Sequence, residues 1–402
     1  MWGAGFSTIA AIRAWAKDEI LGALVVTRLR IARPHGQSGR PIVTIGQLTL
    51  APAEQPPHPR SMTGGDRMQK LIVALTLLFS FAVSSAQNEV ALKLVQTIPL
   101  PEVDGRIDHF AIDVKGRRAF LAALVKSTIE VVDLKAGRVI HTVPGFAKPQ
   151  GVLYVPKFNK LIIASGADGS VKTLDGTTLA VIRTVSVSLG ADAIGYDSQS
   201  KEIYVGSGGG DANKEEGDLT IFNVANGAQV AALTTDAHAG GSVVEGYGER
   251  VFVLVPEKAE VVVFDRKTRE QVAKWTIPGI QKDVAIALDE KSHRLFLGVR
   301  TPASIVVLDS NSGAVVASVP TVATLDGLSF DSATRRIYTS GGEGYVDVTQ
   351  QIDADHYERI AHIPTGPIAR TSVFVPEWHR LYVAVPRDKE RGAELRVFEA
   401  VP

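Results

Sequence analysis

The chain has 402 residues, with 43 basic and 43 acidic side chains, 37 glycines, 20 prolines and no cysteine. The absence of cysteine excludes thiolate zinc fingers, iron–sulfur clusters, covalently attached c-type haem and cysteine nucleophiles. Aromatic residues make up only 6% of the chain, so we expect a core of Val, Ile, Leu and Ala. Such a core favours strands, and the glycine and proline counts indicate many turns.

Residues 68–86 have the layout of a secretory signal peptide. They begin with Met68-Gln69-Lys70, continue with the 13-residue, largely apolar run 71–83, and end with Ser84-Ser85-Ala86. Because a bilayer span needs about 20 apolar residues, the run is too short to cross a membrane. We therefore predict cleavage after Ala86 and a periplasmic or extracellular location. A buried core helix or an uncleaved anchor is the alternative, and the polar residues 87–89 that follow disfavour it.

Residues 1–67 precede this segment although a signal peptide belongs at the N-terminus. They carry eight basic and four acidic side chains, and residues 52–67 are rich in Pro and Gly without an apolar period. These features predict a disordered prefix, which we interpret as an over-extended gene model with translation starting at Met68. Residues 87–402 then hold 34 basic and 39 acidic side chains. This net charge of −5 predicts no nucleic-acid partner.

Residues 87–402 contain one motif repeated seven times. Two-residue apolar pairs recur every 42 to 48 residues, at 119–120, 161–162, 203–204, 251–252, 295–296, 337–338 and 381–382. Each unit holds four short strands separated by Gly, Asp, Asn or Ser turns. Four strands in each of seven units of about 44 residues predict an all-β fold, a seven-bladed β-propeller with four-stranded antiparallel blades. A β-solenoid is the rival architecture.

The ends of the chain favour the propeller over the solenoid. A strand ending in Ile-Pro or Val-Pro closes several units, and the same ending occurs at Thr97-Ile98-Pro99, before the first complete repeat. The last repeat has only three strands, so residues 92–98 are predicted to supply the fourth strand of the seventh blade. A ring closed in this way leaves few unpaired sheet edges, which predicts a monomer.

The repeat resembles that of the YVTN-type seven-bladed propellers, which are secreted or surface proteins of bacteria and archaea. The likeness rests on an acidic strand end, a turn, and then an apolar-aromatic strand, as at Tyr204-Val205-Gly206-Ser207, Tyr338-Thr339-Ser340-Gly341 and Tyr382-Val383-Ala384-Val385. It spans roughly residues 89–401. The resemblance implies the fold and export, and it implies little about chemistry, because a propeller hosts many functions.

The loops that enter the innermost strands of a propeller meet at one mouth of the central channel, where ligands usually bind. Counting back five to seven residues from each innermost strand end selects the candidate ligand-binding residues Asp108, His109, Gln150, Asp192, His238, Asp283, Asp326 and Arg370. The carboxylates in this set could hold a divalent cation through oxygen ligands, with Asp192, Asp283 and Asp326 as metal candidates. No other cofactor is indicated.

These residues also have a structural interpretation. An Asp at a turn accepts backbone N–H bonds, and a repeat copies that role from blade to blade. The sequence therefore predicts an exported, non-enzymatic binding or scaffold protein that holds a protein partner or a small molecule at the channel mouth. The alternative is a metal-dependent, lactonase-like hydrolase that uses Asp108, Asp192, Asp283 or Asp326 as cation ligands.

Overall fold

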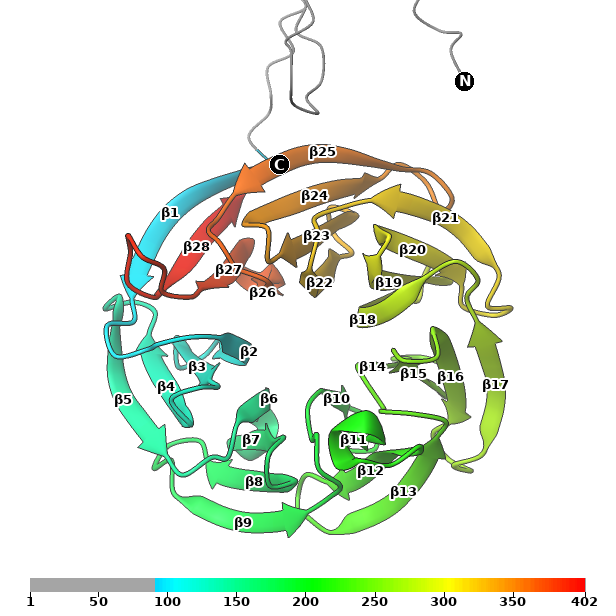
Figure 1. The fold of residues 1–402 in the computed structure, drawn as a ribbon, viewed down its shortest axis with the longest axis horizontal. Helices are drawn as coiled ribbons and strands as arrows, with labels where there is room; N and C mark the ends of the chain where they lie inside the picture. Colours follow the sequence, from blue (N-terminus) through cyan, green and yellow to red (C-terminus); the bar gives the residue numbers. More distant parts are fainter. Residues whose placement is uncertain (1–90, 402) are drawn as a thin grey trace, which may run out of the picture. The chain divides into compact units, whose positions relative to one another are not determined.

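The computed structural model describes residues 91–401, and the predictions made for residues 1–67 and 68–86 lie outside this range. Seven four-stranded antiparallel sheets stand in a ring (Figure 1). Short 3₁₀ helices lie at η1 (Pro156–Phe158), η2 (Gly209–Ala212) and η3 (Pro376–Trp378). The predicted all-β, seven-bladed propeller is therefore confirmed.

The blades are numbered from 1 to 7 along the chain. Each blade contributes one strand to each of four concentric layers. The innermost strands are β2 (Ile107–Asp113), β6 (Pro149–Val155), β10 (Ile194–Asp197), β14 (Ser242–Val244), β18 (Gln281–Asp289), β22 (Leu325–Asp331) and β26 (Thr371–Val375). The second strands are β3 (Arg118–Ala123), β7 (Lys160–Ser165), β11 (Glu202–Gly208), β15 (Arg250–Val255), β19 (Arg294–Thr301), β23 (Arg336–Gly341) and β27 (Arg380–Val385). The third strands are β4 (Thr128–Asp133), β8 (Ser170–Asp175), β12 (Gly217–Asn223), β16 (Glu260–Asp265), β20 (Ala303–Asp309), β24 (Tyr345–Gln351) and β28 (Glu394–Ala400). The outermost strands are β5 (Arg138–Pro144), β9 (Val181–Ser186), β13 (Gln229–Thr235), β17 (Gln271–Thr276), β21 (Val315–Pro320), β25 (Tyr357–Pro364) and β1 (Leu92–Pro99).

The first strand closes the last blade. Strand β1 pairs antiparallel with β28, from Leu92 opposite Ala400 to Pro99 opposite Glu394, and Figure 1 shows it along the outer edge of blade 7. This is the pairing that the Ile98-Pro99 ending predicts. Seven-fold closure gives each blade two neighbours, so apolar residues on both faces of a blade are buried.

The repeated apolar pairs form the core between the blades. Their large second members are fully buried, namely Phe120, Tyr204, Phe252, Phe296, Tyr338 and Tyr382. Aromatic rings meet across the seams: Phe296 and Phe330 lie 5.0 Å apart and Tyr338 stacks on Phe374 at 4.6 Å. Such pairs add about 0.5–1.5 kcal/mol beyond the area they bury. The residues that identify the repeat in the sequence are thus the ones that hold neighbouring blades together.

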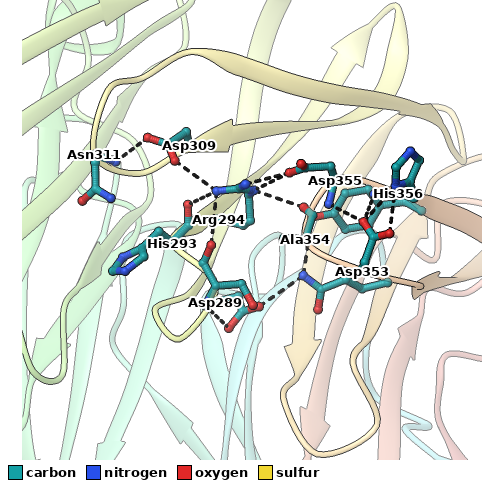
Figure 2. A network of polar contacts seen from close by, with 12 residues as sticks. Asp289, His293, Arg294, Asp309, Asn311, Asp353, Ala354, Asp355 and His356 are labelled. Atoms are coloured by element: carbon teal, nitrogen blue, oxygen red, sulfur yellow. Dashed lines mark hydrogen bonds and ion pairs between the residues drawn. The ribbon is translucent and has the colours of Figure 1, made fainter.

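Polar contacts also join the blades, on the face where each innermost strand ends. Figure 2 shows the seam between blades 5 and 6, where Arg294 is the first residue of β19. Its Nε donates to the carbonyl oxygen of Ala354 at 3.1 Å, and its Nη2 lies 2.6 Å from Asp355 Oδ1. Its Nη1 donates to Asp309 Oδ2 of its own blade at 3.0 Å. One guanidinium therefore links the second strand of a blade to the outer turn of the next blade.

Candidate functional site

The strand register defines equivalent positions at the opposite face of the ring, where the chain enters the innermost strands. Phe110, Val152, Ile194, Ser242, Ile286, Leu328 and Ser372 occupy equivalent places in the pairing of innermost and second strands. Two residues earlier stand Asp108, Gln150, Asp192, Gly240, Val284, Asp326 and Arg370. We call the seven residues at this position the mouth ring. Five of the eight predicted site residues are among them.

The mouth ring borders a cavity of about 210 Å³. Residues from all seven innermost strands line it, and His109 and Asp326 are the charged or titratable residues among them. Most of the other lining atoms belong to small or apolar residues such as Gly151, Ala193 and Gly241. Polar side chains thus gather at one end of a channel whose walls combine polar backbone and hydroxyl groups with apolar side chains, which suits a small molecule that has both kinds of surface.

One half of the mouth ring carries acceptors without donors. Asp108 and Gln150 are buried, and Asp108 Oδ2, Asp192 Oδ1 and Gln150 Oε1 have no hydrogen-bond partner within residues 91–401. His109 Nε2 lies 3.6 Å from Asp192 Oδ1. Within the same range, Asp108, His109 and Asp192 are the residues whose potential ligand atoms all lie within 4.8 Å of one another. We call Asp108, His109, Gln150 and Asp192 the acceptor half.

The electrostatics of the acceptor half favour a positive charge. Burial and the neighbouring charge of Asp192 raise the pKa of Asp108 from 3.8 to about 6. Burial lowers the pKa of His109, but the carboxylates of Asp108 and Asp192 outweigh it and raise this pKa above 6.5. Both shifts follow from placing two carboxylates side by side with little solvent. A cation bound between them would relieve this repulsion.

The other half of the ring carries an excess of donors. Asp326 is buried, and three guanidinium groups surround its carboxylate. Arg106 Nη2 lies 3.3 Å from Oδ2, Arg300 Nη2 lies 2.9 Å from Oδ1, and Arg370 Nε lies 3.0 Å from Oδ2. We call Asp326, Arg106, Arg300 and Arg370 the arginine half. Arg106 also donates to Asp108 Oδ1 at 2.9 Å, so it joins the two halves.

Arg370 lies half-buried beside two other guanidinium groups. Burial lowers its pKa, the charges of Arg106 and Arg300 lower it further, and Asp326 acts in the opposite direction. Its Nε atom, although near Asp326, makes no hydrogen bond within the described part of the chain. A guanidinium with an unused donor beside two like charges is suited to bind an anionic group of a ligand.

Three predicted site residues are not at the mouth-ring position: His109 directly follows Asp108, and His238 and Asp283 lie farther from it. The register places Gly240 at the position expected for His238, whose Nδ1 instead lies 3.2 Å from the carbonyl oxygen of Gly208, the last residue of β11. Its backbone N–H donates to Glu257 Oε2 at 2.8 Å. The sequence count misplaced it because β14 has only three residues and a longer loop precedes it.

Asp283 lies one residue before the ring position because the register of β18 shifts between Asp283 and Ala285. Its side chain is fully buried, and neither carboxylate oxygen has a hydrogen-bond partner within residues 91–401. Burial raises its pKa from 3.8 to about 7, and the charge of Glu260 contributes. Of the three metal candidates, Asp192 therefore belongs to the acceptor half. Asp326 is paired with three arginines, and Asp283 lies outside both halves of the mouth ring.

The sequence count missed Arg106 and Arg300. Arg106 lies just before β2, and Arg300 lies near the end of β19, a second strand that is not counted when only the innermost strands are considered. A signal existed for Arg106, because it stands two residues before Asp108 in the same entry loop. No comparable signal exists for Arg300, since its contact with Asp326 depends on two adjacent blades packing together.

Comparison with known proteins adds support for the fold. No protein-family model and no curated protein matches the chain. A chain of the mitotic checkpoint complex is 14% identical with a TM-score of 0.64, covering 91% of this chain and 100% of that one. The hydrazine synthase of Kuenenia stuttgartiensis is 14% identical, with a TM-score of 0.63 and coverages of 72% and 96%. The RRP9 WD40 repeats are 13% identical, with a TM-score of 0.60 and coverages of 78% and 98%.

The fold and the mouth ring together define a class: a seven-bladed β-propeller with a two-sided polar site at one channel mouth. At identities this low, the similarity to solved structures shows the architecture and nothing about ligands. Residues 91–401 contain no helix with the length and hydropathy of a membrane span.

Proposed function

We propose that this propeller is an exported binding protein that holds a small anionic molecule at the mouth ring through a divalent cation. The observation that carries the proposal is the set of unpartnered acceptors at Asp108, Gln150 and Asp192, with His109 Nε2 in ligating range of the two carboxylates. Oxygen and imidazole ligands suit divalent metals such as Ca²⁺, Mn²⁺ and Zn²⁺ to different degrees. The cation would sit in the acceptor half, and Arg370 would bind the anion beside it.

Export is the second part of the proposal. It is supported by the signal-like segment 68–86 and by the resemblance to the YVTN-type repeat in layout. N-terminal sequencing and intact mass of the protein from the culture medium or periplasm test it, with a mature chain beginning at Gln87 as the expected result. A mature chain that retains residues upstream of Met68 would contradict it. We also expect a monomer, because ring closure leaves few sheet edges to pair.

Cation binding is tested by thermal unfolding and calorimetry with CaCl₂, MnCl₂ or ZnCl₂ added singly to chelator-treated protein. A cation at one hundred times its dissociation constant stabilises the folded state by about 2.7 kcal/mol. Asp192→Asn should weaken binding at least tenfold. The matched control is Asp168→Asn, a carboxylate on the loop between β7 and β8 that is outside the cluster. Equal cation binding by wild type and Asp192→Asn would refute the site.

Metal-assisted hydrolysis of an ester or lactone is the second candidate function, and the position of His109 favours it. His109 is partly exposed beside Asp192, and it lines the cavity. It is therefore placed to transfer a proton to the leaving oxygen of an ester or lactone, and a cation held by Asp108 and Asp192 would supply the acidity that activates the attacking water. A hydrolysis assay on aliphatic lactones and aryl esters distinguishes the two functions. Turnover by the wild type that is lost in both Asp192→Asn and His109→Gln would establish the hydrolase. Ligand binding without turnover would support the binding protein instead.

A further inference from the structure

A second pocket lies at the seam between blades 7 and 1, on the face opposite the mouth ring. Its volume is about 220 Å³, and its lining residues are Arg117, Leu134, Lys135, Trp378, Arg380 and Tyr382. Three of the six are cations, two are aromatic, and none is acidic. Because this seam joins the end of the chain to its beginning, the pocket marks the place where the ring closes.

The other seams on this face explain why a pocket exists here. In several blades the first residue of the second strand is a cation that bonds to the next blade. Lys160 Nζ lies 2.7 Å from the carbonyl oxygen of Val224, and Arg250 donates to the carbonyl oxygen of Ser310. Arg294 and Arg336 make the corresponding contacts with Ala354 and Val401. The acceptor in most of these contacts is the residue just after the third strand. We call this bond, from the first residue of a second strand to a backbone carbonyl of the next blade, the inter-blade latch.

The remaining seams without this latch use their charges in other ways. Arg118 of blade 1 is bonded within its own blade to Asp113 Oδ2, with Nη2 at 2.8 Å. Blade 3 reverses the polarity: Glu202 occupies the position, and Arg269 of blade 4 donates to its two oxygens at 2.8 and 2.7 Å. In both cases the charged group has a partner.

Arg380 differs from all of these residues. It is the first residue of β27, yet within residues 91–401 its side chain forms no ion pair, not even with Glu399, its register partner, and no bond to the next blade; the polar group beside it is the Tyr382 hydroxyl, which belongs to the same pocket. The carbonyl oxygen of Leu134, which corresponds to the latch acceptor, instead accepts from Gln96 Nε2 at 3.4 Å. A guanidinium has five N–H donors, so beyond its contact with Tyr382 Arg380 has donors left for a ligand in the pocket.

The aromatic residues give the pocket a flat wall. Arg117 lies over the Trp378 ring, 6.0 Å from its centroid, and Trp378 packs edge-on against Tyr382 at 6.2 Å. Burial raises the pKa of Tyr382, while the hydrogen-bonding contact and charge of Arg380 and the charge of Arg117 lower it. Guanidinium groups bind carboxylate and phosphate oxygens through paired N–H donors, and aromatic faces stack on flat groups.

We propose that the pocket between blades 7 and 1 is a binding site for a small molecule that carries a carboxylate or phosphate on a flat ring. The oxyanion lies between Arg380, Lys135 and Arg117, and the ring packs against Trp378. The ligand takes the place of the missing latch, so its binding ties the last blade to the first and stabilises ring closure.

The test uses the full chain with benzoate, phenyl phosphate and inorganic phosphate, each at constant ionic strength, and follows binding by calorimetry and thermal unfolding. Benzoate or phenyl phosphate should bind and raise the unfolding temperature, and which of the two binds identifies the oxyanion. Inorganic phosphate should bind at least tenfold more weakly than phenyl phosphate, because it lacks the flat group.

The variants assign the binding to this pocket. Arg380→Gln should weaken binding about tenfold or more, the loss expected for a charge-assisted hydrogen bond. Lys135→Gln, at an exposed position where misfolding is not expected, should weaken it less. Arg391→Gln is the matched control, an arginine of the same blade that is paired with Asp388 outside the pocket, and it should leave binding unchanged. Absence of binding by all three probes, or equal affinity of wild type, Arg380→Gln and Lys135→Gln, would overturn the proposal.

Discussion

The two halves of the mouth ring are built at equivalent positions of one repeat, yet their electrostatics are opposite. In the acceptor half, Asp108 and Asp192 lie close to each other, and each has an oxygen without a donor. In the arginine half, Asp326 has three guanidinium groups around one carboxylate. An Asp at the same place in the repeat thus has an oxygen without a hydrogen-bond donor on one side of the ring and three guanidinium groups around it on the other.

This difference shows that the repeat fixes position and that the neighbouring blades fix chemistry. The backbone places each Asp at the entrance to an innermost strand. Arg300 comes from a second strand and Arg106 from an entry loop, and they determine whether that Asp is a structural ion pair or an available ligand. A ligand that bridges the halves would offer a cation to one and an anion to the other, which is the arrangement proposed above.

The largest loss of stability is expected from Asp326→Ala. The substitution leaves Arg106, Arg300 and Arg370 without the carboxylate that holds them together. Removing one partner from a buried ion pair costs about 3–5 kcal/mol, and we expect about 3 kcal/mol because the arginines are partly exposed. Urea unfolding at pH 7 measures the loss. The surface variant Asp236→Ala, which removes the exposed partner of Lys274, should lose less than about 1 kcal/mol. Equal losses would show that the arginine half is no more than a surface network.

An effect of opposite sign is expected from Asp283→Asn. Burial raises the pKa of Asp283 to about 7 in the folded protein, whereas an unfolded chain has a value near 3.9. The wild type therefore loses stability as the pH rises from about 4 to 7, because the unfolded state releases the proton first. One pKa unit corresponds to about 1.4 kcal/mol, so the rise to about 7 makes ionisation of the buried Asp283 cost about 4 kcal/mol, and the cost of burying the amide is the same at every pH.

The measurement is the free energy of unfolding of wild type and Asp283→Asn from pH 4 to pH 8. We expect the two proteins to be closest near pH 4, and the variant to gain on the wild type by up to about 4 kcal/mol at pH 8, relative to pH 4. A difference that does not change with pH would show that Asp283 has a partner or solvent access that keeps its pKa low.

The fold was largely predictable because its signals are local and repeated. The spacing of pairs such as Leu295-Phe296 and Ile337-Tyr338 gave seven units, and Thr97-Ile98-Pro99 gave the strand that closes blade 7. Period-two alternation, turn residues and a proline at the strand end each act within a few residues. Such signals can be read along the chain without knowledge of what lies beside it.

The site was only partly predictable because its chemistry depends on contacts between blades. Counting from strand ends found Asp108 and Asp326, but it placed His238 at a position that belongs to Gly240 and took Asp283 for a ring member despite the shift in β18. It also missed Arg300, which lies 26 residues from Asp326 and meets it only across a seam. Counting residues along the chain does not reveal loop lengths, register shifts or contacts between blades.

The smallest effect tests the acceptor half directly. In chelator-treated protein, Asp192→Asn removes one of two neighbouring carboxylates that lack donors, so repulsion with Asp108 falls and the free energy of unfolding should rise by up to about 1 kcal/mol. With saturating cation the sign should reverse, because the wild type gains binding energy that the variant has lost. Thermal unfolding of both proteins with and without the cation gives the four values required. A destabilised variant in the chelator would mean that Asp192 is a structural turn residue, and the two halves of the mouth would then differ in charge without differing in function.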